Sequence, residues 1–139
     1  MQTQPPNAVA VLKWAFLAAI LIITGVGFFL GPQLEPSLEE DMRYVIGGIL
    51  LLVAVSSFLL TRYLVLPGMA RQQAQPSAIA STAYAFAESP AIYGLVLAIM
   101  TTEGWIALPF GALALLCWLV MSNYVASLQA AAPVDFPRL

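Results

Sequence analysis

Histidine is absent from the 139-residue chain, and cysteine occurs only once. The lack of histidine excludes imidazole acid–base chemistry and most zinc ligand sets, and a single cysteine excludes an internal disulfide. Charge is also scarce, because charged residues make up 9% of the chain against about 25% in soluble domains. So few charges cannot cover a globular surface, which excludes a soluble domain and a disordered tail. We therefore predict an integral membrane protein without a metal site or cofactor.

The sequence does contain long apolar stretches, and hydrophobic residues make up 61% of it. A membrane-spanning helix needs about 20 mostly apolar residues. Four stretches qualify, at about residues 9–30, 44–66, 78–101 and 105–128. Backbone polar groups in lipid must pair within the segment, so each stretch is expected to be helical, and the alternating strands of a porin-like barrel do not occur. Short connections make sequential helices antiparallel neighbours. We predict an all-α membrane protein in which residues 1–139 form one domain, an up-down bundle of four transmembrane helices.

The basic residues indicate an orientation. Lys13, Arg62, Arg71 and Arg138 fall on one side of a four-span topology, and only Arg43 falls on the other. The acidic residues on the Arg43 side are Glu35, Glu39, Glu40, Asp41 and Glu103. Because basic residues concentrate in cytoplasmic segments, we expect both termini in the cytoplasm.

One ionisable residue, Glu88, lies near the middle of a predicted span. A charge at that depth costs roughly 2.5–3.5 kcal/mol on insertion scales, which favours the neutral acid or a polar partner. A functional carboxyl group and a structural hydrogen bond to a neighbouring helix are both compatible with this position. Ser81 and Tyr84 share its side of the helix at 3.6 residues per turn.

Small residues recur at steps of three or four along the same segment. They are Ala80, Ala83, Ala87, Ala91, Gly94 and Ala98. Such a face is typical of helices that pack closely in membranes. Glu88 lies about 100° around the helix from the centre of this face, at the border of the expected helix contact.

Ser56 and Ser57, near the middle of the second predicted span, are the first candidates to reach Glu88, because an antiparallel neighbour places them at its depth. Alternatively, each serine hydroxyl bonds the carbonyl four residues earlier in its own helix. Pro90 frees the carbonyl of Phe86, half a turn from Glu88. This carbonyl could join a site for a proton, hydronium or Na⁺, or the proline could serve packing only.

The run AFAESPAIYGLVLAIM resembles the carboxylate-bearing helix of the rotary ATP synthase c subunit, the membrane proteolipid. The resemblance implies that Glu88 is the ion-carrying carboxylate. It also implies that Ser89 and Tyr93 complete the site, as in Na⁺-binding members. A proton or Na⁺ is the implied cargo.

The whole chain is also similar to small bacterial four-helix membrane proteins of unknown function. The similar segments are residues 87–94 and the tail Phe136-Pro137-Arg138. This resemblance implies a multi-pass protein of the bacterial inner membrane and no particular activity.

Two function classes follow. The first is an accessory or assembly subunit of a membrane complex, with further copies of itself or other membrane subunits as partners. The second is a proton or sodium translocating unit that uses Glu88. An enzyme is not expected, because the loops hold no nucleophile–base pair, metal cluster or phosphate cradle. The bilayer is an expected partner and nucleic acid is not.

Overall fold

The structure is a computed structural model that describes residues 8–131, and it is helical throughout this range apart from short connections. The tail segment Phe136-Pro137-Arg138 lies outside the described residues. The similarity to small four-helix membrane proteins and the charge count rest partly on this segment. The main helices are α1 (Ala8–Leu30), α2 (Glu40–Leu60), α3 (Leu66–Arg71), α4 (Pro76–Thr101) and α5 (Ala107–Ala131). Three short helical turns, η1 (Gly31–Gln33), η2 (Thr61–Val65) and η3 (Gly104–Ile106), join them.

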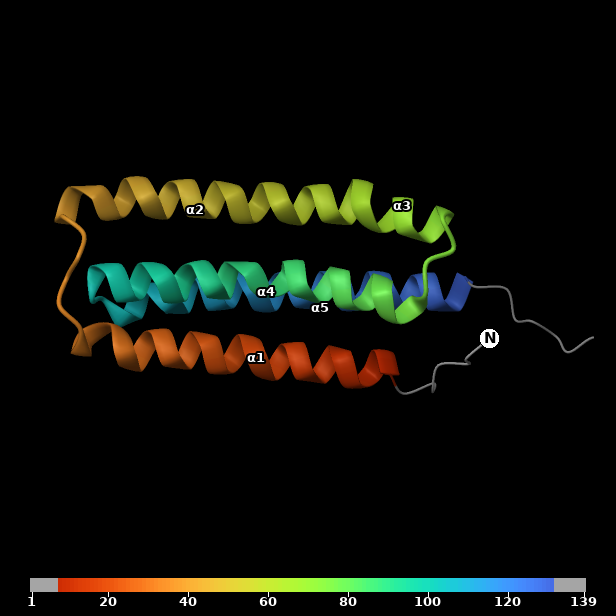
Figure 1. Ribbon diagram of the computed structural model, residues 1–139, viewed down its shortest axis with the longest axis horizontal. Coiled ribbons are helices and arrows are strands. Elements are labelled where there is room, and N and C mark those ends of the chain that lie inside the picture. The colour runs from red at the N-terminus through yellow and green to blue at the C-terminus, as the bar shows by residue number, and fades with distance from the viewer. Residues whose placement is uncertain (1–7, 132–139) are drawn as a thin grey trace, which may run out of the picture.

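Four of these helical segments are long and apolar enough to cross a membrane. They are Ala8–Gln33, Glu40–Arg71, Pro76–Thr101 and Gly104–Ala131. They pack together and run alternately up and down the long axis (Figure 1). The prediction of an all-α protein is confirmed, with four packed helices that are long and apolar enough to span a membrane. α1 starts and α5 ends at one end of the bundle, here called the terminal end, and the opposite end, with η1 and η3, is called the loop end.

The second spanning helix is longer than residues 44–66, the range predicted from the apolar run. It begins at Glu40 and continues through η2 and α3 to Arg71. Pro67 does not end it, because the proline lies in the first turn of α3, where a missing N–H is tolerated. The wide π-type turn η2 precedes it, and the Thr61 hydroxyl there donates to the Ser57 carbonyl at 2.8 Å. The connection expected at residues 67–77 is therefore reduced to 72–75.

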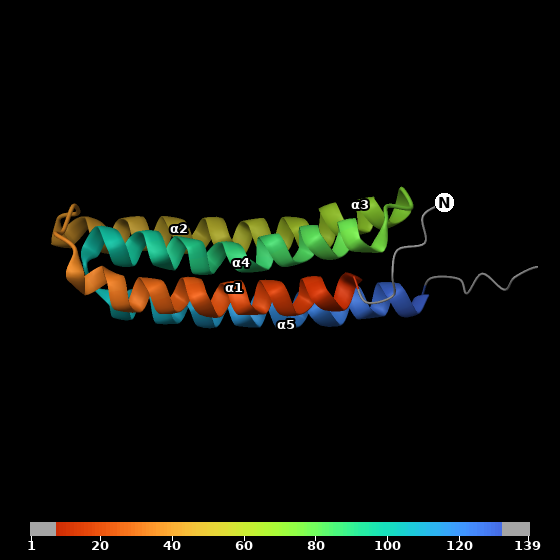
Figure 2. The ribbon, with the colours of Figure 1, turned by 60° about the horizontal axis from the view of Figure 1, so that its bottom comes forward.

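α4 is the central helix and packs against α1, α2 and α5 (Figures 1 and 2). Its predicted small-residue face is buried: Ala80, Ala83, Ala87, Ala91, Gly94 and Ala98. A Cβ atom on Gly94 would lie 2.5 Å from the Cβ of Phe110 in α5, so only glycine allows this approach. Small side chains let backbones come close enough for extensive van der Waals contact, which drives helix association in lipid.

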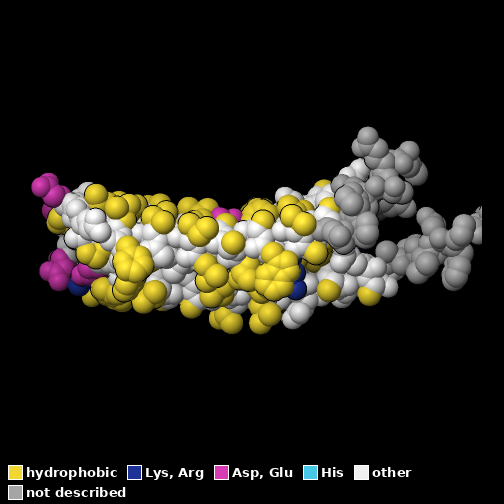
Figure 3. Space-filling view, turned by 90° about the horizontal axis from the view of Figure 1, so that it is seen from below, with side chains coloured by type: hydrophobic (Ala, Val, Ile, Leu, Met, Phe, Trp, Pro, Cys, Tyr) yellow, Lys and Arg dark blue, Asp and Glu magenta, His cyan; other side chains and the backbone are white. Residues whose placement is uncertain are grey.

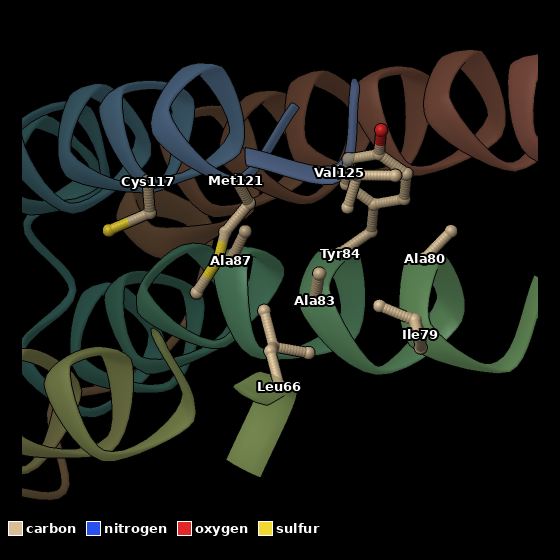
Figure 4. Packing of buried hydrophobic residues seen from close by; sticks show 9 residues of the cluster. All are labelled: Leu66, Ile79, Ala80, Ala83, Tyr84, Ala87, Cys117, Met121 and Val125. Atoms are coloured by element: carbon tan, nitrogen blue, oxygen red, sulfur yellow. The ribbon is translucent and has the colours of Figure 1, made fainter. Parts of the chain in front are cut away.

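The core between α4 and α5 is built largely from small and flexible side chains. Figure 4 shows Met121 and Val125 of α5 meeting the alanine face of α4, with Leu66 of α3 on its other side. Met121 and Leu66 are fully buried. A core of this kind follows from the alanine face, since longer side chains on neighbouring helices fill the space that alanine leaves.

The outer surface of the bundle is apolar along its length and charged toward its ends. Figure 3 shows hydrophobic side chains over the middle of one face and acidic side chains gathered at the loop end. The second spanning segment is especially exposed, with Leu52 of α2 at 67% and Tyr63 of η2 at 66%. This is the surface expected of a protein surrounded by lipid.

We expect Gly94→Ala to destabilise the protein by about 1–3 kcal/mol, because the new methyl group overpacks the α4–α5 contact. Gly25→Ala in α1 is the matched control, since a Cβ there meets nothing within 4 Å. The control should be neutral or stabilising by up to about 1 kcal/mol, through helix propensity. Denaturant unfolding in detergent measures both, and equal effects would contradict the close-approach explanation.

Candidate functional site

Glu88 occupies the middle of the 26-residue helix α4, as the sequence predicts from the span. It is half-buried and lines a shallow hollow of about 240 Å³ with Ala15, Phe16 and Ala19 of α1. Among the described residues, its carboxyl group has no hydrogen-bond or ion-pair partner. A polar group at mid-span is thus in contact with apolar side chains on the α1 side.

The structure does not bring the serines of α2 to Glu88. α2 packs on a different side of α4 from α1, and Ser56 is exposed while Ser57 is half-buried. The Ser57 carbonyl instead accepts the hydrogen bond from Thr61. Tyr93 is also directed elsewhere, because it packs against the cluster around Leu97, away from the hollow beside Glu88. Lying at the same depth on neighbouring helices is not sufficient when the side chains occupy different faces.

Tyr84 is one turn from Glu88 but belongs to the core. Its side chain is 1% exposed, and its hydroxyl is hydrogen-bonded to Ser122 of α5. Its ring lies 6.0 Å from that of Phe16 in α1, measured between centroids. Tyr84 therefore connects three helices through one polar contact and one aromatic contact. Ser122 was not predicted, and only its position on the buried face of α5 identifies it.

Ser89 fills the backbone acceptor that Pro90 leaves free. Its hydroxyl donates to the Phe86 carbonyl at 2.7 Å. In a regular helix this carbonyl would accept the N–H of residue 90, which proline lacks. The Phe86 carbonyl is thus satisfied within α4. Ser89 and the freed carbonyl, both candidates for an ion site, bond to each other in this structure.

One face of α4 is left uncovered between α1 and α2. Figure 1 looks onto this face, with α2 above it, α1 below it and α5 behind. Ala85, Ile92 and Val96 are exposed on it, and Ser89 is half-buried. Glu88 lies at its α1 border. The uncovered face of α4, defined by these residues, is therefore mostly small or apolar with one carboxyl group at its edge.

A second polar centre lies at the loop end, and the sequence did not reveal it. Arg43 of α2 forms an ion pair with Glu103, the residue before η3, and its guanidinium also contacts Glu40 at 3.1 Å and the Tyr44 hydroxyl at 3.0 Å. Arg43 is the one basic residue at an otherwise acidic end, which was the available signal. The pair links α2 to the connection between α4 and α5.

Two basic residues at the terminal end, Lys13 and Arg62, lie over aromatic rings. The Lys13 ammonium lies 5.4 Å from the centre of the Trp118 ring, and the Trp118 indole N–H donates to the Lys13 carbonyl at 3.0 Å. The Arg62 guanidinium lies 3.5 Å from the centre of the Tyr124 ring of α5. Cation–π contacts of this kind stabilise a cation near the membrane interface. Arg62 thus joins η2 to α5 at this end, as Arg43 joins α2 to the α4–α5 connection at the other.

No family model, no curated protein and no solved structure matches this chain. Within residues 8–131, no group of three or more acidic or cysteine side chains is placed to hold a metal ion. The candidate site therefore has to be judged on its own geometry.

A double-mutant cycle tests whether the Ser89 hydroxyl compensates for the N–H that Pro90 lacks. We expect Ser89→Ala to cost about 1 kcal/mol, because it leaves the Phe86 carbonyl without a donor. In a Pro90→Ala background the restored backbone N–H fills that carbonyl, and Ser89→Ala should then cost close to nothing. Unfolding in detergent gives the four stabilities. An equal cost in both backgrounds would show that the hydroxyl does not compensate for the proline.

Proposed function

We propose that this chain is a small, non-enzymatic assembly subunit of the membrane, which binds a transmembrane helix of a partner subunit on the uncovered face of α4. The observation that carries the proposal is Glu88: a carboxyl group at mid-span, half-buried, without a polar partner among the described residues. A polar group in the hydrocarbon core is costly unless it is paired. A helix seated beside Glu88 with a hydroxyl, amide or basic side chain would pair it.

The neighbouring residues suit such a contact. Ala85 and Ser89 are small, and small residues allow a partner helix to approach closely. Ile92 and Val96 add exposed apolar surface on the same face, at 42% and 43%. The predicted partners include other copies of the chain as well as other membrane subunits, and the experiment below distinguishes them by mass.

The alternative is a proton or sodium translocating unit in which Glu88 binds the ion. Its support is the same mid-span carboxyl group. Ion coordination needs several oxygen atoms around the cation, and Ser56, Ser57, Tyr84 and Tyr93 do not gather around Glu88. We therefore favour helix binding.

The charges support an orientation in which the terminal end faces the cytoplasm, as expected for an inner-membrane protein of a bacterium. Lys13, Arg62 and Arg71 belong to this end, and the acidic residues of the loop end lie opposite. Basic residues are retained on the cytoplasmic side of membranes.

A photoreactive amino acid in place of Ala85 tests the helix-binding proposal. In intact membranes we expect one adduct of defined mass, and a doubled chain mass would identify a second copy as the partner. The same reagent in place of Leu119, exposed on α5, is the control and should give no such adduct. Equal labelling from both positions would contradict a specific face.

Glu88 variants then test the role of the carboxyl group. Glu88→Gln should retain the adduct, because an amide still donates and accepts hydrogen bonds. Glu88→Leu should reduce it about three- to tenfold, the range for one polar contact between membrane helices. Measuring proton and Na⁺ flux in proteoliposomes distinguishes ion translocation from helix binding. Flux in the unchanged chain that Glu88→Gln abolishes would favour translocation over helix binding.

Cysteine labelling tests the orientation. In a Cys117→Ala background, Gln72→Cys at the terminal end should react with a membrane-impermeant reagent only from the cytoplasmic side. Glu35→Cys at the loop end should react only from the other side. Both positions are exposed. The reverse pattern would overturn the orientation.

A further inference from the structure

A cavity at the loop end lies between α2 and α5, away from the uncovered face of α4. Its volume is about 300 Å³. Arg43, Glu103 and Trp105 line its interfacial part, and Gly48 and Phe110 line its deeper part. It thus combines charged groups near the membrane surface with an apolar interior, the pattern that matches an amphiphile.

Glycine creates this cavity. Gly47 and Gly48 both line it without a side chain. A Cβ on Gly48 would meet nothing within 4 Å, and one on Gly47 would lie 3.2 Å from the Leu97 side chain of α4. From Arg43 to Leu51, the deepest lining residue on α2, eight residues of helix span about 12 Å. The cavity therefore extends from the interface into the hydrocarbon layer, and its depth suits part of an acyl chain.

The cavity opens sideways toward lipid rather than only toward water. Tyr44 and Trp105 at its rim are 69% and 58% exposed. Aromatic side chains of this type mark the level of lipid headgroups. A bilayer lipid can therefore enter with its headgroup beside Arg43 and its chain against Gly48.

The polar end has one unfilled donor and one unfilled acceptor. Within the described residues, Arg43 Nε and Glu103 Oε2 are buried without a hydrogen-bond partner. Both atoms are covered by protein, so binding of a headgroup includes a small rotation of the two side chains. A ligand that satisfies both must offer an acceptor oxygen to Arg43 Nε and an N–H or O–H donor to Glu103 Oε2.

The surrounding charge selects among headgroups. Four acidic residues lie near Arg43, the one basic residue at this end of the described chain: Glu39, Glu40, Asp41 and Glu103. This excess of negative charge disfavours a purely anionic lipid. A choline headgroup carries a cation but no N–H donor for the Glu103 carboxylate. A headgroup with a phosphate and a primary ammonium meets every condition.

We propose that the cavity between α2 and α5 binds a phosphatidylethanolamine-type phospholipid, with its phosphate at Arg43, its ammonium at Glu103 and one acyl chain along Gly47 and Gly48. The bound lipid fills the gap between α2 and α5 at the loop end. The inference does not depend on the proposed function, which uses a different face of α4.

Native mass spectrometry of the full chain tests the site, with equimolar phosphatidylethanolamine, phosphatidylcholine and phosphatidylglycerol of identical chains. We expect the ethanolamine lipid to be retained about tenfold over either competitor, as one charge-assisted hydrogen bond provides. Glu103→Gln should bring its ratio to phosphatidylcholine close to one. Glu35→Gln, which removes a charge at the same end outside the cavity lining, is the control and should keep the preference.

Gly48→Leu is a second, independent test of the cavity. The leucine side chain would fill the cavity, because nothing lies within 4 Å of a Cβ at this position. It should abolish retention of all three lipids, whereas Gly25→Leu, equally unobstructed in α1, should retain the ethanolamine lipid. Helical content from circular dichroism verifies that each variant is folded. Equal retention of the three lipids, a preference for the anionic lipid, or unchanged retention in folded Gly48→Leu would overturn the proposal.

Discussion

Close contact between α4 and its neighbours is the interaction on which the rest of the structure depends. In lipid, apolar side chains gain little by leaving their surroundings for one another, so helices associate through fitted van der Waals contact and hydrogen bonds. α4 meets this requirement with buried alanines and with Gly94, which lies against Phe110. The helix with this small-residue face is also the one that contacts α1, α2, α3 and α5.

The position of α2 follows from this arrangement. α4 and α5 share the most extensive contact. α2 adds few buried residues, and Ala54 is the one buried position within it. Two arginines hold the second spanning segment: Arg43 of α2 pairs with Glu103, and Arg62 of η2 lies over the Tyr124 ring. Both contacts lie near the ends of the bundle. Between them, Gly47 and Gly48 leave a cavity between α2 and α5 instead of close packing.

Glu88 and the Arg43–Glu103 pair show two ways in which this chain, which has few charges, places an ionisable group in a membrane protein. The pair lies at the membrane boundary and is largely neutralised within the protein, so it can join helices at moderate cost. Glu88 lies at mid-span, and the described residues provide it no partner. The protein therefore combines an ion pair that joins helices at the membrane boundary with a mid-span carboxyl group that is suited to an intermolecular contact.

The number, type and approximate ends of the spanning helices could be read from the sequence, because lipid permits only long apolar helices and these dominate the composition. The small-residue face of α4 could also be read, since helical periodicity is a local property. The surroundings of Glu88 could not. Whether Ser57 or Phe16 lies beside it depends on the rotation of each helix about its axis, which packing against three neighbours sets. The same holds for Arg43 and Glu103, 60 residues apart, which meet only because α2 and the α4–α5 connection reach the same end of the bundle.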